Sequence, residues 1–142
     1  MPNRLRTSNS LLFIKASLAW FLIMLVAIAN GIVREALLEP ALGPAIALPL
    51  SGILLALIIL LASWLLVPWF GRALASTWFA IGSLWVVLTL LFEYLFGHFV
   101  AGIPWREISR IFDVASGNLF LLALLSAALS PWLAARLHGL VG

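Results

Sequence analysis

The chain has 142 residues, of which 65% are hydrophobic and 9% are charged, with seven Trp, nine Phe and no Cys. Soluble domains average about 45–50% apolar and about 25% charged residues, and a globule of this length has too little interior to bury the excess, so the composition excludes a soluble globular protein and a disordered chain. The net charge of +3 is too small and dispersed for a nucleic-acid-binding surface, and the absence of Cys excludes disulfides and thiolate sites. The composition therefore predicts a protein whose surroundings are mostly lipid.

Four apolar stretches are long enough to cross a membrane. Because the hydrocarbon core of a bilayer is about 30 Å thick, a helix needs about 20 mostly apolar residues to span it, and these stretches cover about residues 16–36, 48–67, 76–96 and 117–135. Backbone groups in lipid must be satisfied within their own segment, so each stretch is predicted to be a helix rather than a strand. We therefore expect an all-α integral membrane four-helix bundle, in a single transmembrane domain over residues 1–142.

The two segments that connect these spans on the side away from the termini differ in character. Residues 32–47 are rich in Pro and Gly, which favours a loop, with a helical continuation of the first span towards Leu38 as the alternative. Residues 97–116 place Trp105, Ile108 and Phe112 at positions i, i+3 and i+7, which is typical of a short amphipathic helix lying in the membrane interface. A plain connector that caps the bundle fits the same spacing equally well.

Charge placement predicts the orientation. The side that holds both termini carries basic residues and no acid: Arg4, Arg6, Lys15, Arg72 and Arg136. The other side carries Arg34, Arg106 and Arg110 with all five acids, which are Glu35, Glu39, Glu93, Glu107 and Asp113. The net charges are therefore +5 and −2, which recover the total of +3. Because positive segments stay on the cytoplasmic side, we expect a multi-pass protein of the bacterial inner (plasma) membrane with its N-terminus and C-terminus in the cytoplasm.

An alternative for the first span is a cleaved signal peptide. Basic residues precede an apolar run that contains Ala27, Ile28 and Ala29, and this order matches an A-x-A cleavage site. The run is long for the apolar region of a signal peptide, so a retained helix is expected.

The residues inside the spans are predicted to serve packing and contact with the surroundings. Trp20, Phe21 and Trp85 are expected to face lipid or a protein partner, and Trp78 is expected in the aromatic belt at the inner interface. Serines such as Ser51 are expected to bond to their own preceding turn. Small residues spaced four apart favour close helix packing, as in the pairs Gly52 with Ala56 and Ala123 with Ala127.

Polar side chains gather where three of the spans end, near the predicted outer face. Asn30 and Arg34 stand at i and i+4 and so share one helical face. The candidate site residues are Asn30, Arg34, Glu35, Glu93, His98, Asp113 and Asn118.

Glu93 is the most informative of these residues because it lies within the apolar run LTLLFEYLF. An ionised carboxylate costs about 2.5–3.5 kcal/mol at the centre of a membrane helix and less towards its end, so it must be paired, protonated or hydrated. Arg34 is the natural partner, with Arg106 or Arg110 as alternatives from above. One interpretation is an Arg–Glu clamp that locks two helices together; the other is a substrate or proton site.

Neither a metal, a haem nor a catalytic residue is predicted. A haem would need paired histidines within the bundle, and His138 lies on the opposite side from His98. Glu93, His98 and Glu35 or Asp113 are conceivable metal ligands, but no H-x-x-x-H or E-x-x-H spacing supports a metal site. No G-x-S-x-G motif or phosphate-binding glycine loop occurs, so no cofactor is expected.

Two segments resemble a known group of proteins: residues 30–43 (NGIVREALLEPALG) and residues 92–98 (FEYLFGH). They are similar to an uncharacterised family of small four-helix bacterial integral membrane proteins, and the resemblance covers nearly the whole chain. It implies the architecture and no activity, and it implies that the following residues matter: Asn30, Gly31, Arg34, Pro40, Gly43, Glu93, Gly97 and Asp113. Asn118 stands where relatives are expected to carry Arg, which argues against an ion pair from the start of the fourth span.

Three functions fit these features. The first is a non-enzymatic accessory or scaffold protein of the inner membrane, whose partners are the lipid bilayer and a homo-oligomer or larger membrane complex, and not nucleic acid. The second is a small transporter or channel that uses Glu93 as a binding or proton-coupling carboxylate. The third is a lipid- or quinone-modifying membrane enzyme, with Glu93 and His98 as acid and base and Arg34 on an anionic head group. Whether Arg34 and Glu93 form a closed ion pair or line an open, wet pocket is the observation that best separates them.

Overall fold

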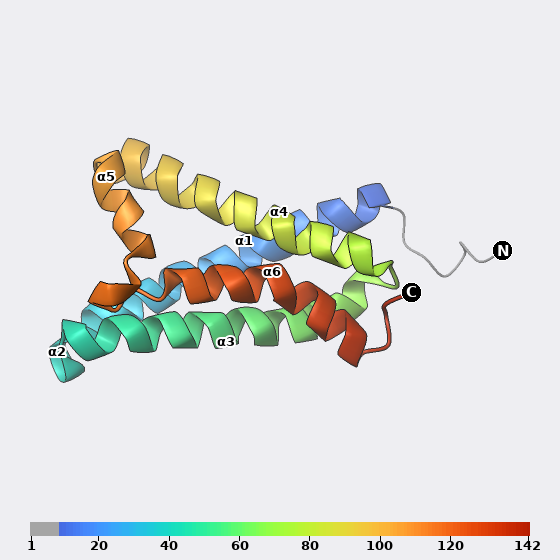
Figure 1. The fold of residues 1–142 in the computed structure, drawn as a ribbon, viewed down its shortest axis with the longest axis horizontal. Helices are drawn as coiled ribbons and strands as arrows, with labels where there is room; N and C mark the ends of the chain where they lie inside the picture. Colours follow the sequence, from blue (N-terminus) through green and yellow to red (C-terminus); the bar gives the residue numbers. More distant parts are fainter. Residues whose placement is uncertain (1–8) are drawn as a thin grey trace.

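Four long helices dominate the structure, a computed structural model that describes residues 9–142 (Figure 1). They are α1 (Asn9–Val33), α3 (Pro44–Phe70), α4 (Ala75–Leu95) and α6 (Phe120–Leu137). All four, with the helical turns that continue α1 and α4, are long and apolar enough to cross a membrane. No β-strand occurs among these residues. The predicted all-α class and the long apolar helices are therefore confirmed.

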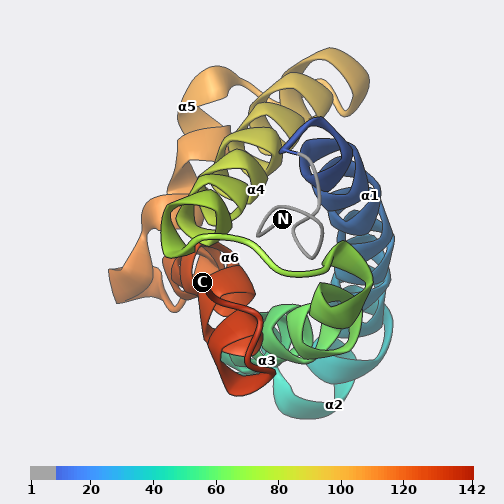
Figure 2. The same ribbon diagram turned by 90° about the vertical axis from the view of Figure 1, so that its right-hand side faces the viewer.

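The helices form a ring in the order α1, α3, α6 and α4 when the bundle is seen end-on (Figure 2). The start of α1, the α3–α4 connection and the end of α6 lie at one end, which we call the terminal end (Figure 1). The α1–α3 and α4–α6 connections lie at the other end, which we call the acidic end because Glu35, Glu39, Glu107 and Asp113 are in these connections. Towards the acidic end α4 diverges from α3, and the segment that carries α5 crosses between them (Figure 1).

The predicted loop over residues 32–47 is wrong, because this segment is almost entirely helical. The chain leaves α1 through a π-helical turn, η2 (Arg34–Leu38), and continues into α2 (Glu39–Leu42). The helix breaks only at Gly43, whose φ of +84° is strained for any residue with a side chain. Pro44 then takes the first position of α3, where a helix needs no backbone N–H.

The second connection is made of short helical turns. A π-helical turn, η3 (Phe96–Val100), extends α4, and it is followed by α5 (Trp105–Ile108) and the 3₁₀ turns η4 (Ser109–Phe112) and η5 (Val114–Ser116). Of the three apolar residues at helical spacing in this connection, only Ile108 is buried. Its side chain packs against Gly97, where an added Cβ would lie 3.2 Å from Ile108 Cδ1.

Two tryptophans of α4 fill the bundle centre. Trp78 and Trp85 are fully buried, and Phe70 stacks on Trp78 with ring centroids 5.9 Å apart. The indole Nε1 of Trp85 donates to the carbonyl of Ala16 at 2.9 Å, which ties α4 to α1. The expectation that Trp85 faces lipid or a partner is therefore wrong, whereas Phe21 is exposed. Every face of these helices is apolar, so hydropathy carries no signal for the inward face.

Small residues bring α6 close to its neighbours. Ala56, Ala123 and Ala127 are buried, and the Ser126 hydroxyl donates to the Ala56 carbonyl at 2.7 Å. The closest approach is at Gly82 of α4, where an added Cβ would collide with the backbone carbonyl of Ala128.

Candidate functional site

A cavity of about 260 Å³ opens at the acidic end between α1, α3, α4 and the start of α6. Its polar lining consists of Asn30, Arg34, Ser51, Glu93 and Asn118. Its apolar lining includes Met24, Leu48, Leu55, Phe92, Ile111 and Phe120. The four long helices and the turn η4 thus enclose an amphiphilic space.

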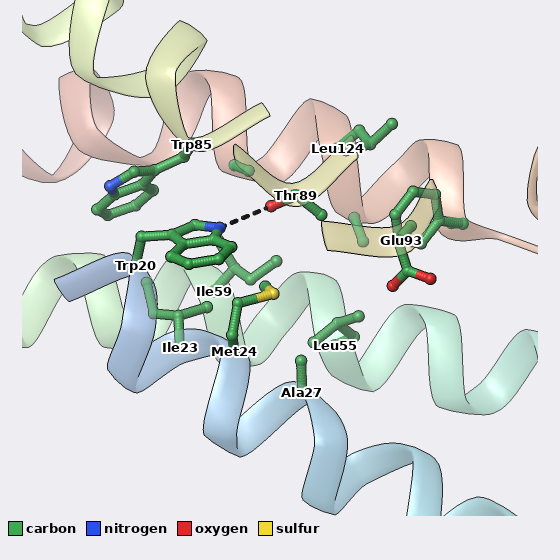
Figure 3. A pocket seen from close by; sticks show the side chains of 13 residues that line it. Trp20, Ile23, Met24, Ala27, Leu55, Ile59, Trp85, Thr89, Glu93 and Leu124 are labelled. Carbon is green, nitrogen blue, oxygen red and sulfur yellow. Dashed lines mark hydrogen bonds between the residues drawn. The ribbon is translucent and has the colours of Figure 1, made fainter. Parts of the chain in front are cut away.

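A smaller, mostly apolar void of about 30 Å³ adjoins this cavity on the side of the bundle centre (Figure 3). Both spaces are lined by Met24, Ala27, Leu55, Glu93 and Phe120. The void has room for about two water molecules. Figure 3 shows the Glu93 carboxylate turned inward, towards Leu55 of α3. Glu93 therefore stands where the polar cavity meets the apolar interior.

The wall of the void is held by a hydrogen bond between α1 and α4. Trp20 Nε1 donates to Thr89 Oγ1 at 3.0 Å (Figure 3). The Trp20 ring also packs edge-on against Phe92. Thr89 and Glu93 stand at i and i+4 on α4 and so share a face. This spacing was the sequence signal that could have assigned Thr89 to the site.

The expected ion pair between Arg34 and Glu93 is not formed. The guanidinium of Arg34 lies 3.7 Å (Nη2) from Glu35 Oε1 and 3.8 Å (Nε) from Glu39 Oε1. The positive charge of Arg34 attracts the Glu93 carboxylate from a distance, without a direct contact. The Glu93 carboxylate makes no hydrogen bond or ion pair with any residue from 9 to 142. The site is therefore an open polar cavity rather than a closed clamp.

The π-helical turn at Arg34 explains this arrangement. A π-helix bonds each N–H to the carbonyl five residues earlier, and the Glu39 N–H donates to the Arg34 carbonyl. Glu39 is thereby placed over Arg34, on a face that residue i+4 would take in an α-helix. Arg34 Nε is buried without a hydrogen-bond partner, and the guanidinium lies beside the two acids at the rim of the cavity.

Two amides make structural bonds at the cavity wall. Asn30 Nδ2 donates to the backbone carbonyl and the hydroxyl of Ser51, at 3.1 and 3.0 Å, which joins α1 to α3. Asn118 Oδ1 accepts from the backbone N–H of Phe120 at 3.1 Å and caps the start of α6. Ser51, which was expected to bond to its own turn, is therefore part of this interhelical contact.

Three of the predicted site residues do not line the cavity. Glu35 is exposed at the rim beside Arg34. His98 bonds through Nδ1 to the Ile103 carbonyl at 2.9 Å and stacks on Trp105, so it fixes the connecting segment. Asp113 is exposed in the turn before η5. Within residues 9–142, no three His, Asp or Glu side chains gather closely enough to hold a metal ion.

No protein family, curated protein or solved structure matches this chain. The chemistry of the site therefore rests on its geometry: a carboxylate without a partner, a guanidinium already flanked by two acids, and an apolar wall. Such a site is suited to binding a small molecule.

Proposed function

We propose that this chain is a multi-pass protein of a bacterial inner membrane that binds a small molecule in the cavity at the acidic end, as a small transporter with Glu93 as its binding or proton-coupling carboxylate. The supporting observation is that Glu93 faces an open cavity without a pairing partner. An ionisable group at membrane depth is costly, and a purely structural clamp would have paired it.

The membrane location is supported by the surface of the bundle. Large apolar side chains such as Leu18, Leu57 and Leu125 are more than half exposed along the helices, which is unfavourable in water and favourable in lipid. Lys15, Arg72 and Arg136 lie at the terminal end and the acids at the other. By the positive-inside rule, we propose that both termini are cytoplasmic and that the chain is a single transmembrane domain.

The packing of the bundle centre beyond the cavity favours a carrier over a channel. Beyond the small void the bundle centre is filled by Trp85, Trp78 and Phe70, all fully buried. A bound molecule would therefore need a change of conformation to cross, and small bundles achieve this as homo-oligomers, which is the assembly we propose here.

The absence of Cys allows a direct test with single cysteines in an otherwise unchanged chain. Gly31 lines the cavity, and an added Cβ there would have no atom within 4 Å. We expect Gly31→Cys in spheroplasts to react with a membrane-impermeant thiol reagent added outside. Val26→Cys, exposed on the outer surface of the same helix, is the matched control and should stay unmodified because lipid suppresses the reactive thiolate. Ser76→Cys at the terminal end should react only after permeabilisation.

Two results would contradict the proposal. If Gly31→Cys stays as unreactive as Val26→Cys, the cavity is closed to water and the accessory or scaffold function is favoured. If Ser76→Cys reacts in intact spheroplasts, the orientation is reversed.

A further inference from the structure

We propose that the ligand of this cavity is an organic monocation, whose ammonium group binds the Glu93 carboxylate while a short apolar chain packs against the neighbouring helices. This inference rests on the proposed function and names the substrate class of the same site.

The charges around the cavity favour a cation. Arg34 is flanked by Glu35 and Glu39, so its positive charge is compensated at the rim, and Glu93 adds a third acid within the cavity. Arg34 and these three acids together carry a charge of −2, and Glu93 is the acid among them that lines the cavity. An anionic ligand would have to displace the rim acids from Arg34 while facing Glu93, whereas a cation meets a carboxylate that has no partner. The arginines of the α5–η4 segment are exposed and do not line the cavity.

The free acceptors of the site suit a ligand that donates. Asn30 uses its Nδ2 donor on Ser51, so the group that it leaves for a ligand is the acceptor Oδ1. A primary ammonium carries three N–H donors and no acceptor, which matches a free carboxylate and an amide oxygen. Two donors also remain in the lining, Asn118 Nδ2 and the buried Arg34 Nε, so the preference for a cation rests on the charge of Glu93.

The remaining wall favours an apolar part of limited size. Phe92 and Phe120 place two aromatic rings beside Glu93, and aromatic rings attract cations. The cavity volume of about 260 Å³ is about nine times that of the adjoining void, which admits an amine with a chain of about six carbons.

Matched probes test this charge preference. In micelles of dodecyl maltoside, which carries neither charge nor amine, Gly31→Cys is modified with the neutral reagent N-ethylmaleimide in the presence of hexylammonium, hexanoate or hexanol. These probes share one chain and differ in the charge of the head. We expect hexylammonium to slow modification about tenfold at a concentration where hexanoate and hexanol slow it less than about twofold, as one unit charge a few ångströms away predicts.

Variants of the two charged residues in the cavity lining test which group causes the protection by hexylammonium. Glu93→Gln in the Gly31→Cys background should abolish the protection by hexylammonium, whereas Glu93→Asp, which keeps the charge, should retain it. Arg34→Gln removes the opposing charge and should strengthen the protection. An unchanged modification rate without probe shows that each variant is folded with its cavity open.

The same ammonium chemistry has two sources, a free amine or the amino head group of a lipid. To separate these sources, phosphatidylethanolamine is added to the micelles without any free amine, with phosphatidylglycerol as the control. If the lipid head group is the natural occupant, phosphatidylethanolamine should slow the modification of Gly31→Cys. If a free amine is the natural occupant, the rate should stay unchanged.

The outcomes separate this inference from the proposed function. Protection by hexanoate equal to that by hexylammonium, or protection that survives Glu93→Gln, overturns the cation preference and leaves the binding cavity standing. Failure of Gly31→Cys to react under any condition overturns the proposed function instead.

Discussion

The two ends of the bundle treat their polar side chains in opposite ways. At the terminal end, basic side chains donate to backbone carbonyls of other segments at 2.8–3.0 Å: Lys15 to Trp69, Arg72 to Gly139 and His138 to Trp64. The Ala73 and Val141 backbones pair there as an isolated bridge, and Trp78 Nε1 bonds to the Leu140 carbonyl. The basic side chains at this end therefore tie separate segments of the chain together.

At the acidic end, the two charged groups of the cavity lining stay unsatisfied by the residues from 9 to 142. Glu93 has no hydrogen-bond partner and Arg34 Nε is buried without one. A buried group without a partner costs about 1–3 kcal/mol. The comparison teaches that the scarce charges of this chain divide into those that stabilise the fold and those left available to a ligand.

The largest expected difference between the closely packed bundle and the acidic end is the effect of adding a methyl group. Gly82→Ala should lower the free energy of unfolding by about 1–3 kcal/mol, because the added methyl group collides with the Ala128 carbonyl. Gly31→Ala, its control at the acidic end, should instead raise it by up to about 1 kcal/mol, because the helix gains propensity and the site is open. Unfolding by SDS in mixed micelles measures both. Equal effects would show that the acidic end is as tightly packed as the rest.

A smaller effect is expected from the buried indole of the closed region. Trp85→Phe should lower the free energy of unfolding by about 1–2 kcal/mol, because it removes the bond to the Ala16 carbonyl and part of the core volume. Trp64→Phe changes the same residue type at an exposed position and should cost less than about 0.5 kcal/mol. If the two variants lower the free energy of unfolding by the same amount, Trp85 does not belong to a closely packed core.

The smallest effect is expected at the unpaired carboxylate. Glu93→Gln should raise the free energy of unfolding by up to about 1 kcal/mol, because no interaction is lost and a charge without a partner is removed. Asn30→Ala, in the same cavity wall, should lower it by about 0.6–1.7 kcal/mol through loss of the bonds to Ser51. A large loss for Glu93→Gln that Arg34→Gln partly repairs would instead reveal a structural clamp.

Hydropathy was sufficient to predict the four long helices, and most of the predicted helix ends lie within a few residues of the observed ones. The depth of the polar residues was also sufficient to predict that Asn30, Arg34, Glu93 and Asn118 lie near one another, and all four line one cavity. Depth along a helix is thus readable from a sequence of this composition.

Rotation about the helix axis was not readable. Trp78 and Trp85 lie on helices that are apolar all round, so no periodicity marks their inward face. The partner of Arg34 was missed for a related reason: three glutamates were within plausible reach, and no residue pattern indicated the π-helical turn that selects Glu39 over Glu93.

That turn makes the site tolerant of one change in chain length. A π-helical turn accommodates one residue more than an α-helical turn, so deleting one residue of Arg34–Leu38, for instance the exposed Leu37, would restore α-helical geometry. Glu39 would then follow Arg34 by four residues and would stay on the same helical face. The guanidinium would therefore keep this acidic neighbour, and Glu93 would stay without a partner. A single-codon deletion, a change that a scan of substitutions never samples, is thus expected to leave the cavity open.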